Sequence, residues 1–207
     1  MKSMVRRAIA STALDADESK TGSRAEWLVT NGLGGYASGT IYGPMTLRYH
    51  GLLIAALPAP LGRCVMLSGL IEEIQLEDGS QVELGPRRDP QENHELKPNL
   101  LSEFRLEMGL PIWRYQIGDL VLERYLHLPY RQNTVQIGYR LLAGSPEVEI
   151  SLRPLIQFRE HETPVSGQPD GPYTLTVLDD NYEVSAAALP PLRMLLYGKG
   201  EFLVQRQ

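Results

Sequence analysis

The sequence predicts an all-β protein, built as a large antiparallel β-sandwich with long loops and little helix. Three observations lead to this fold class. Apolar and polar residues alternate with a period of two in several segments, turn-forming residues separate those segments, and no stretch of ten residues shows the periodicity of an amphipathic helix. Half-buried strands joined by short turns are typical of such sandwiches.

Three segments carry the alternation that indicates strands. Apolar side chains take every second position within residues 134–141, 147–153 and 173–177. Between the expected strands lie combinations of Gly, Asp, Asn and Pro that favour turns. The clearest of them are Asp78-Gly79, Gly118-Asp119, Gly144-Ser145-Pro146 and Gly198-Lys199-Gly200.

One hairpin can be predicted in register. A two-residue turn would set Leu76 opposite Gln81, on the wrong face of the hairpin. A three-residue loop over residues 77–79, with Gly79 in the left-handed conformation, instead sets Ile74 opposite Val82. We expect the three-residue loop, because it keeps the apolar residues on one face.

The domain organisation follows from where these signals begin and end. Residues 1–22 are expected to form a disordered leader, and residues 23–207 a single β-sandwich domain. Two polar segments rich in proline and charge, 86–100 and 159–172, are predicted to be long loops. Long loops on a rigid sheet scaffold often carry function.

Composition narrows the function class. A net charge of −5 and a pI near 5.4 argue against a nucleic-acid partner. The single cysteine, Cys64, lies in an apolar segment and is expected to be a buried core thiol. No apolar run is long enough to span a membrane, and the N-terminus lacks a signal-peptide core. We therefore expect a cytoplasmic protein without a membrane partner.

The most informative segment is residues 26–57, EWLVTNGLGGYASGTIYGPMTLRYHGLLIAAL. It holds six glycines, and the five at positions 32, 34, 35, 39 and 43 fall within twelve residues. So many glycines indicate positive φ angles or close approach of backbone segments. Aromatic, amide and charged residues surround them. The segment is therefore expected to form a conformationally demanding surface.

This segment resembles the start of the N-terminal domain of glycogen debranching enzymes of the archaeal and bacterial type. The resemblance rests on Trp27-Leu28, the run from Thr30 to Thr40, the block from Arg48 to Leu53, and the strand from Gly62 to Leu67. Shorter agreements follow at Asn133-Thr134-Val135 and from Leu152 to Arg159. Two departures stand out: Leu47-Arg48 replaces a pair of arginines, and Arg159-Glu160-His161 is one residue shorter than the family pattern.

The resemblance implies a supersandwich-like β domain that precedes an (α/α)-barrel catalytic domain in the same polypeptide. The barrel would carry the catalytic acids, and the whole enzyme would be a glycoside hydrolase that cleaves α-1,6-glucosidic branch points. No barrel sequence follows Gln207, so the chain is expected to be either an excised domain or a naturally short relative.

Candidate substrate-binding residues come from the glycine-rich segment and from the downstream match. In a strand, Arg48 and His50 would share a face and could hold sugar hydroxyls. They could equally be a surface ion-pair residue and a satisfied, partly buried histidine. Trp27 could stack on a sugar ring or belong to the core, and Asn31 fits a turn. The full predicted set is Trp27, Asn31, Tyr36, Arg48, Tyr49, His50, Arg159 and His161.

No catalytic, metal or cofactor site is predicted in this chain. Glycoside hydrolysis needs two carboxyl groups across the scissile bond. Glu72 and Glu73 are neighbours in an expected strand and would face opposite sides. Glu160 and Glu162 flank His161 and could form a metal or acid-base cluster, but a solvated charged loop is the simpler reading. The four histidines are widely spaced, and the glycines match no phosphate-binding motif.

Two functions remain open. The chain could be a non-catalytic domain that binds α-glucan, such as glycogen or branched maltodextrin, and supports the barrel. It could instead be a purely structural or interaction module without glucan affinity. A small self-sufficient hydrolase is a weaker third reading. A polar groove with aromatic lining would favour the first, and an exposed apolar patch the second.

Overall fold

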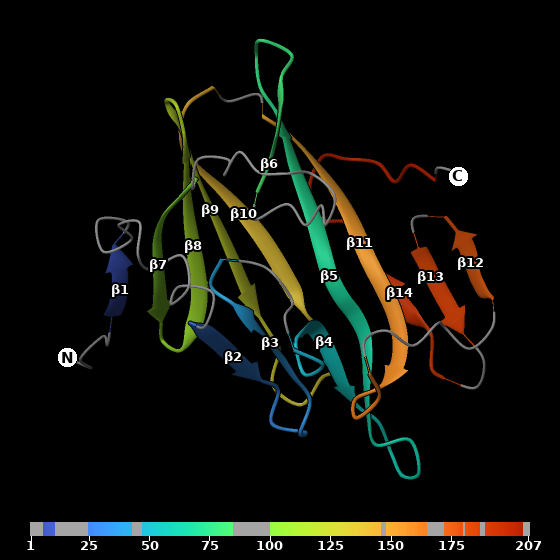
Figure 1. The fold of residues 1–207 in the computed structure, drawn as a ribbon. Helices are drawn as coiled ribbons and strands as arrows, with labels where there is room; N and C mark the ends of the chain where they lie inside the picture. The colour runs from blue at the N-terminus through green and yellow to red at the C-terminus, as the bar shows by residue number, and fades with distance from the viewer. Residues whose placement is uncertain are drawn as a thin grey trace. The chain divides into compact units, whose positions relative to one another are not determined.

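The computed structural model describes residues 6–10, 25–42, 47–84, 100–145, 148–164, 172–179, 181–186 and 189–204 (Figure 1). The chain divides into two compact units, residues 1–165 and 166–207. Every regular element in the described ranges is a β-strand, so the predicted all-β class is confirmed. No described helix could span a membrane.

The first unit contains two antiparallel sheets. One sheet has the order β1-β7-β8-β9-β10. In it β7 pairs with β8, β8 with β9, and β9 with β10. Its strands are β1 (Arg6–Ala10), β7 (Leu101–Glu107), β8 (Leu110–Ile117), β9 (Leu120–His127) and β10 (Gln136–Ala143).

The other sheet of this unit has the order β11-β5-β4-β3-β2, and the short β6 pairs with β5. Its strands are β2 (Glu26–Thr30), β3 (Tyr36–Thr40), β4 (Gly51–Ala56), β5 (Arg63–Gln75), β6 (Gln81–Glu83) and β11 (Glu149–Glu160). The long strands β5 and β11 run side by side along this sheet (Figure 1).

Aromatic side chains join the two sheets face to face. Trp27 on β2 meets Trp113 on β8 edge-on, with ring centroids 5.2 Å apart, and Phe104 packs on Trp113 at 5.4 Å. The Trp113 indole nitrogen donates a hydrogen bond of 2.9 Å to the Ile41 carbonyl oxygen, just after β3. All three rings are buried. The predicted β-sandwich is therefore confirmed.

The interior of the sandwich also holds an ion pair. Arg124 on β9 donates from Nε to Glu72 Oε1 on β5 at 2.7 Å, and the Tyr139 hydroxyl donates to the same oxygen. Both charged residues are buried, and the Arg124 guanidinium lies 4.6 Å from the Trp113 ring centroid. Burial opposes the charge on Arg124, but the Glu72 carboxylate together with Tyr139 and Tyr115 outweighs it, so the pKa of Arg124 is raised.

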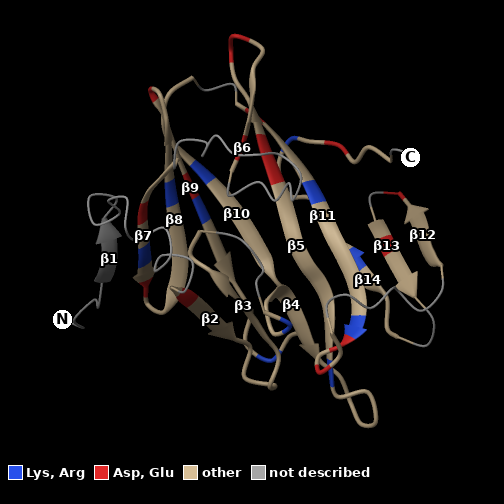
Figure 2. Ribbon diagram, viewed as in Figure 1, with Lys and Arg blue, Asp and Glu red and all other residues tan. Residues whose placement is uncertain are grey.

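The outward face of the β7–β10 sheet is charged but mixed in sign. Arg105 bonds Glu123 at 2.7 Å and Glu107 at 2.8 Å, and Arg114 bonds Glu123 at 3.0 Å. In Figure 2, red and blue segments follow one another along β7 and along β9, whereas β8 between them carries blue only. The described ion pairs of this face therefore interleave opposite charges across neighbouring strands.

The predicted hairpin is confirmed in detail. Ile74 pairs with Val82, Gln75 pairs with Gln81, and Gly79 has a φ of 82°. Asp78 accepts hydrogen bonds from the backbone and hydroxyl of Ser80, which fixes the loop. The three alternating segments also form strands, with β10, β11 and β12 covering most of them. Cys64 is buried, as expected.

Two segment predictions need comment. Arg159 and Glu160 complete β11, so the loop predicted for 159–172 was wrong at its start; residues 165–171 and most of 86–100 lie outside the described residues. Within the predicted leader, Arg6–Ala10 form β1, paired antiparallel with the edge strand β7. Pairing with an open edge uses backbone groups and needs no apolar pattern. The rest of 1–22 lies outside the described residues.

The second unit contains a small antiparallel sheet of the order β12-β13-β14. Its strands are β12 (Tyr173–Leu178), β13 (Asn181–Ala186) and β14 (Leu192–Met194). Leu175 pairs with Val184, which pairs with Leu192, so one face of the sheet is apolar. Tyr182 on β13 stacks on Phe202 with centroids 3.8 Å apart.

Candidate functional site

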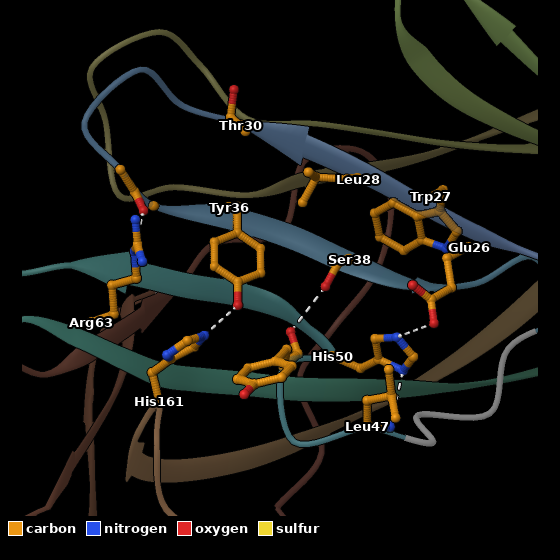
Figure 3. Close-up of a pocket in the computed structure, with 13 residues that line it drawn as sticks. Glu26, Trp27, Leu28, Thr30, Tyr36, Ser38, Leu47, His50, Arg63 and His161 are labelled. Carbon is orange, nitrogen blue, oxygen red and sulfur yellow. Dashed lines mark hydrogen bonds and ion pairs between the residues drawn. The ribbon is translucent and has the colours of Figure 1, made fainter.

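An open groove of about 580 Å³ lies over the outward side of β2 and β3 (Figure 3). Two further segments border it, the turn at residues 47–50 and the end of β11 with the following turn. Its lining combines apolar and hydrogen-bonding side chains from positions far apart in the sequence. They are Glu26, Trp27, Leu28, Thr30, Gly34, Gly35, Tyr36, Ser38, Leu47, Tyr49, His50, Arg63 and His161.

The turn between β2 and β3 is fixed by Asn31, which is fully buried. Its side-chain oxygen accepts hydrogen bonds from the backbone N–H groups of Leu33 and Gly35, at 2.9 and 3.0 Å. A Cβ atom on Gly35 would lie 2.6 Å from Asn31 Nδ2 and 2.9 Å from the Ile54 carbonyl oxygen. Only glycine fits there, which explains part of the glycine-rich pattern. The prediction of Asn31 as a turn residue is confirmed.

Tyr36 and His161 form the centre of the groove. The Tyr36 hydroxyl lies 2.6 Å from His161 Nε2, and His161 Nδ1 lies 3.2 Å from a carboxylate oxygen of Glu162. A neutral imidazole with its proton on Nδ1 satisfies both contacts, since it donates to Glu162 and accepts from Tyr36. Burial raises the pKa of Tyr36, although Arg63 opposes the shift, so the phenol stays protonated and remains a donor.

The turn at residues 47–50 forms the second wall. His50 is 4% exposed, its Nδ1 accepts from the Leu47 N–H at 3.3 Å, and its Nε2 lies 3.5 Å from Glu26 Oε1. Burial lowers the pKa of His50, and the Glu26 carboxylate opposes this shift. His50 therefore holds the turn to β2 in its neutral form.

The expected strand at Arg48 to His50 was wrong, because these residues form the turn before β4 and do not share a face. The Arg48 side chain is exposed and contacts the Tyr49 hydroxyl and the Glu162 carboxylate. A turn forms because the His50 N–H bonds back to the Leu47 carbonyl at 3.0 Å. The two predicted side chains therefore act in different places, His50 in the wall and Arg48 outside it.

Arg159 makes hydrogen bonds to both the turn at residues 47–50 and the turn that follows β11. Its Nη1 donates to the Thr163 carbonyl oxygen at 3.0 Å, and its Nη2 donates to the carbonyl oxygen of Arg48. Burial lowers the pKa of Arg159, with the neighbouring Cys64 and Tyr36 opposing. The guanidinium thus fixes the relative positions of both turns through backbone oxygens.

Family models identify the domain that carries this groove. Residues 25–207 match the family described as glycogen debranching enzyme N terminal. The chain belongs to this family. Searches of the curated proteins and of the solved structures returned no match.

Five of the eight residues predicted to bind substrate line the groove of this debranching-enzyme N-terminal domain, namely Trp27, Tyr36, Tyr49, His50 and His161. Asn31, Arg48 and Arg159 do not line it and support its walls instead. Trp27 is only 6% exposed, and its indole nitrogen donates to the Thr40 carbonyl oxygen at 3.1 Å. The Trp27 ring packs in the core. Of the two predicted roles, sugar stacking and core packing, its position matches core packing.

Several groove residues of this debranching-enzyme N-terminal domain were not predicted. Arg63 donates from Nε to the Gly34 carbonyl oxygen at 2.7 Å, and its guanidinium lies 6.0 Å from the Tyr36 ring centroid. Leu28 is 61% exposed in the floor of the groove. The alternation of Glu26, Leu28 and Thr30 in a strand could have predicted this outward row. Arg63 belongs to a segment that carries the resemblance, but nothing local indicated that it would reach the groove.

Three of the glutamates weighed from the sequence as candidate catalytic acids each contact a basic side chain in the part of the chain the structure describes. Glu72 is buried against Arg124, and Glu73 faces the other way, 3.6 Å from Arg153. Glu162 bonds His161 and Arg48. Within the same ranges no three His, Cys, Asp or Glu side chains gather closely enough to hold a metal ion.

Proposed function

We propose that this debranching-enzyme N-terminal domain binds α-glucan, such as glycogen or branched maltodextrin, in the groove over β2 and β3. In the full cytoplasmic enzyme it would also support an (α/α)-barrel catalytic domain of the same polypeptide, which hydrolyses α-1,6-glucosidic branch points. The domain itself contributes binding and no catalytic acid.

One observation carries the proposal: the groove sets apolar surface beside hydrogen-bonding groups that are already held in place. Leu28 and Tyr49 are 61% and 37% exposed and offer the apolar surface. The Ser38 hydroxyl donates to the Tyr49 carbonyl oxygen at 2.9 Å, so this wall is fixed before a ligand arrives. A sugar ring has the same division into apolar faces and polar edges.

The chemistry of the polar groups also fits a neutral ligand. With His161 protonated on Nδ1, the Tyr36 hydroxyl donates a hydrogen bond to His161 Nε2, and its oxygen retains a lone pair for a sugar hydroxyl. Arg63 lines the groove and uses Nε for the Gly34 carbonyl oxygen. Glu26 offers acceptors on the other side. Donors and acceptors in one groove suit hydroxyl groups, which do both.

Calorimetric titration of the chain with glycogen and with a short branched maltodextrin tests this proposal. Leu28→Ser should weaken binding, because it removes exposed apolar surface from the groove floor. Leu178→Ser is the matched control, since Leu178 is 69% exposed on β12 and Leu28 is 61% exposed on β2. Equal affinities of the two variants would contradict the groove as the glucan site.

A second pair of variants tests the polar side of the groove. Arg63→Ala removes the guanidinium beside Tyr36, and Arg153→Ala removes an exposed arginine that pairs with Glu73 at 3.6 Å. We expect only Arg63→Ala to weaken glucan binding. If the unmodified chain gives no saturable heat with either ligand, glucan binding by this domain is excluded.

The alternative, a structural or interaction module, has an observation of its own. Strand β12 exposes Leu175, Val177 and Leu178, at 42%, 49% and 69%. Apolar surface of this kind often marks a protein contact. A chain that binds no glucan, and that self-associates less once Leu175 and Val177 are changed to Ser, would favour this second function.

A further inference from the structure

The loop between β9 and β10 displays an aromatic ring next to the glycine-rich turn. Tyr130 is 77% exposed, which places it among the most exposed large side chains of the described residues. A single exposed tyrosine needs no explanation by itself. What sets Tyr130 apart is that the backbone after it is held by hydrogen bonds and that its ring lies over Gly32.

The ring of Tyr130 occupies space that Gly32 leaves open. Gly32 has a φ of 77°, and a Cβ atom at this position would lie 2.6 Å from Tyr130 Cε2 and 2.9 Å from Cδ2. Real side chains do not approach so closely, so a residue with a Cβ at position 32 would displace the ring. Glycine at position 32 is therefore required both by the φ angle of the turn and by the Tyr130 ring that lies over it.

Asn31 holds the backbone on the C-terminal side of Tyr130. The Arg131 N–H donates to the Asn31 carbonyl oxygen at 2.7 Å, and Asn31 Nδ2 donates to the Gln132 carbonyl oxygen at 2.9 Å and to Asn133 Oδ1 at 3.1 Å. Asn133 in turn bonds the backbone N–H and carbonyl of Ala56, at 2.9 and 2.8 Å. The loop that carries Tyr130 is thus fastened to both the β2–β3 turn and β4.

We propose that Tyr130 is a second contact for the glucan, outside the groove, on which a sugar ring of a longer chain packs after leaving the groove past Gly34. The proposal rests on the proposed function, because the groove must hold the first part of the chain. Gly34 lines the groove and lies two residues from Gly32, a Cα separation of at most about 8 Å. An aromatic ring on a loop that is held before binding loses less conformational entropy on contact than one on a free loop.

Chain length tests this geometry directly. Calorimetric titrations would compare maltotriose with maltoheptaose, because only the longer chain can fill the groove and reach Tyr130. Tyr130→Ala should weaken maltoheptaose about fivefold to tenfold and leave maltotriose unchanged. Tyr197→Ala is the control, since Tyr197 is 86% exposed in the second unit. It should change neither affinity.

A glycine pair tests the supporting role of the turn. Gly32→Ala and Gly79→Ala place a Cβ at similar φ angles, 77° and 82°, but only the first meets a neighbour within 4 Å, the Tyr130 ring. We expect Gly32→Ala to weaken maltoheptaose as Tyr130→Ala does, and the double variant to show no further loss. Gly79→Ala should keep the affinity of the unmodified chain.

The outcomes separate this inference from the proposed function. If Leu28→Ser weakens both sugars while Tyr130→Ala binds maltoheptaose normally, the groove stands and the Tyr130 contact is overturned. If Tyr130→Ala weakens maltoheptaose while Leu28→Ser has no effect, glucan contacts Tyr130 without using the groove, and both the groove and the path from it to Tyr130 are overturned. A chain that binds neither sugar overturns both.

Discussion

Removing one member of the ion pair between the two sheets should destabilise the sandwich strongly. Glu72 is 5% exposed and Arg124 is 6% exposed, and their contact of 2.7 Å joins β5 to β9. Glu72→Leu would leave the Arg124 charge buried without its carboxylate. It would also remove the acceptor of the Tyr139 hydroxyl.

The expected cost follows from the interactions that are lost. Two unit charges about 4 Å apart attract by about 4 kcal/mol at an effective dielectric constant of about 20. Breaking a buried pair on one side costs about 3–5 kcal/mol, whereas replacing both partners by apolar residues is often close to neutral. We therefore expect Glu72→Leu and Arg124→Met to lose about 3–5 kcal/mol each, and the double variant to recover most of that loss.

Urea unfolding followed by tryptophan fluorescence is a suitable assay. Trp27 and Trp113 are the two tryptophans of the chain and both lie in the first unit, so the signal reports on the sandwich. The control is the neighbouring pair Glu73 and Arg153, 3.6 Å apart on the opposite, more exposed face. Its double-mutant cycle should give about 0–1 kcal/mol. Equal coupling energies for the two pairs would refute the reasoning.

Three further predictions concern the walls of the groove. The pKa of His50 is lowered in the folded chain, so below about pH 6.5 the unfolded chain takes up a proton at His50 before the folded chain does. The midpoint of urea unfolding should therefore decrease as the pH falls from about 6.5 through the folded-state pKa. The His50→Asn variant should not show this part of the decrease. Arg159→Lys should cost about 1–2 kcal/mol of stability and weaken glucan binding, because an ammonium group cannot bond the carbonyl oxygens of Arg48 and Thr163 at the same time. Unchanged glucan affinity of this variant would contradict a positioning role for Arg159. Asn31→Asp should cost about 2–4 kcal/mol at neutral pH despite its equal size, since a carboxylate oxygen would face two acceptors; a thermal melt like that of the unmodified chain would refute this.

Local features of the fold could be predicted well from the sequence. The pairing of Ile74 with Val82 followed from alternation and one glycine, because side-chain period and turn length determine register in a hairpin. The turn role of Asn31 followed from the tendency of its amide to bond nearby backbone. Both arguments use residues fewer than ten positions apart.

The groove could be predicted only in part, since it depends on contacts between distant segments. Tyr36 and His161 lie 125 positions apart, and β11 brings them together through its pairing with β5. The predicted strand that contains Arg48 and His50 was wrong for a different reason. The segment has strand-like residues, but the hydrogen bonds of His50 to Leu47 close a turn that alternation cannot reveal. Tertiary contacts of this kind override local patterns.

The glycine-rich motif acts mainly through backbone geometry. Asn31 uses both side-chain atoms for internal hydrogen bonds, and Gly32 and Gly35 are required by what lies against them, Tyr130 and the Asn31 amide. None of these three residues has side-chain groups left to hold a sugar. The side chains proposed to contact a ligand belong to β2, β3 and β5, to the turn at residues 47–50 and to the loop before β10. On our proposal the motif marks where a ligand binds, and Leu28, Arg63 and Tyr130 set how strongly it binds. Variants of these three residues should therefore separate affinity from folding.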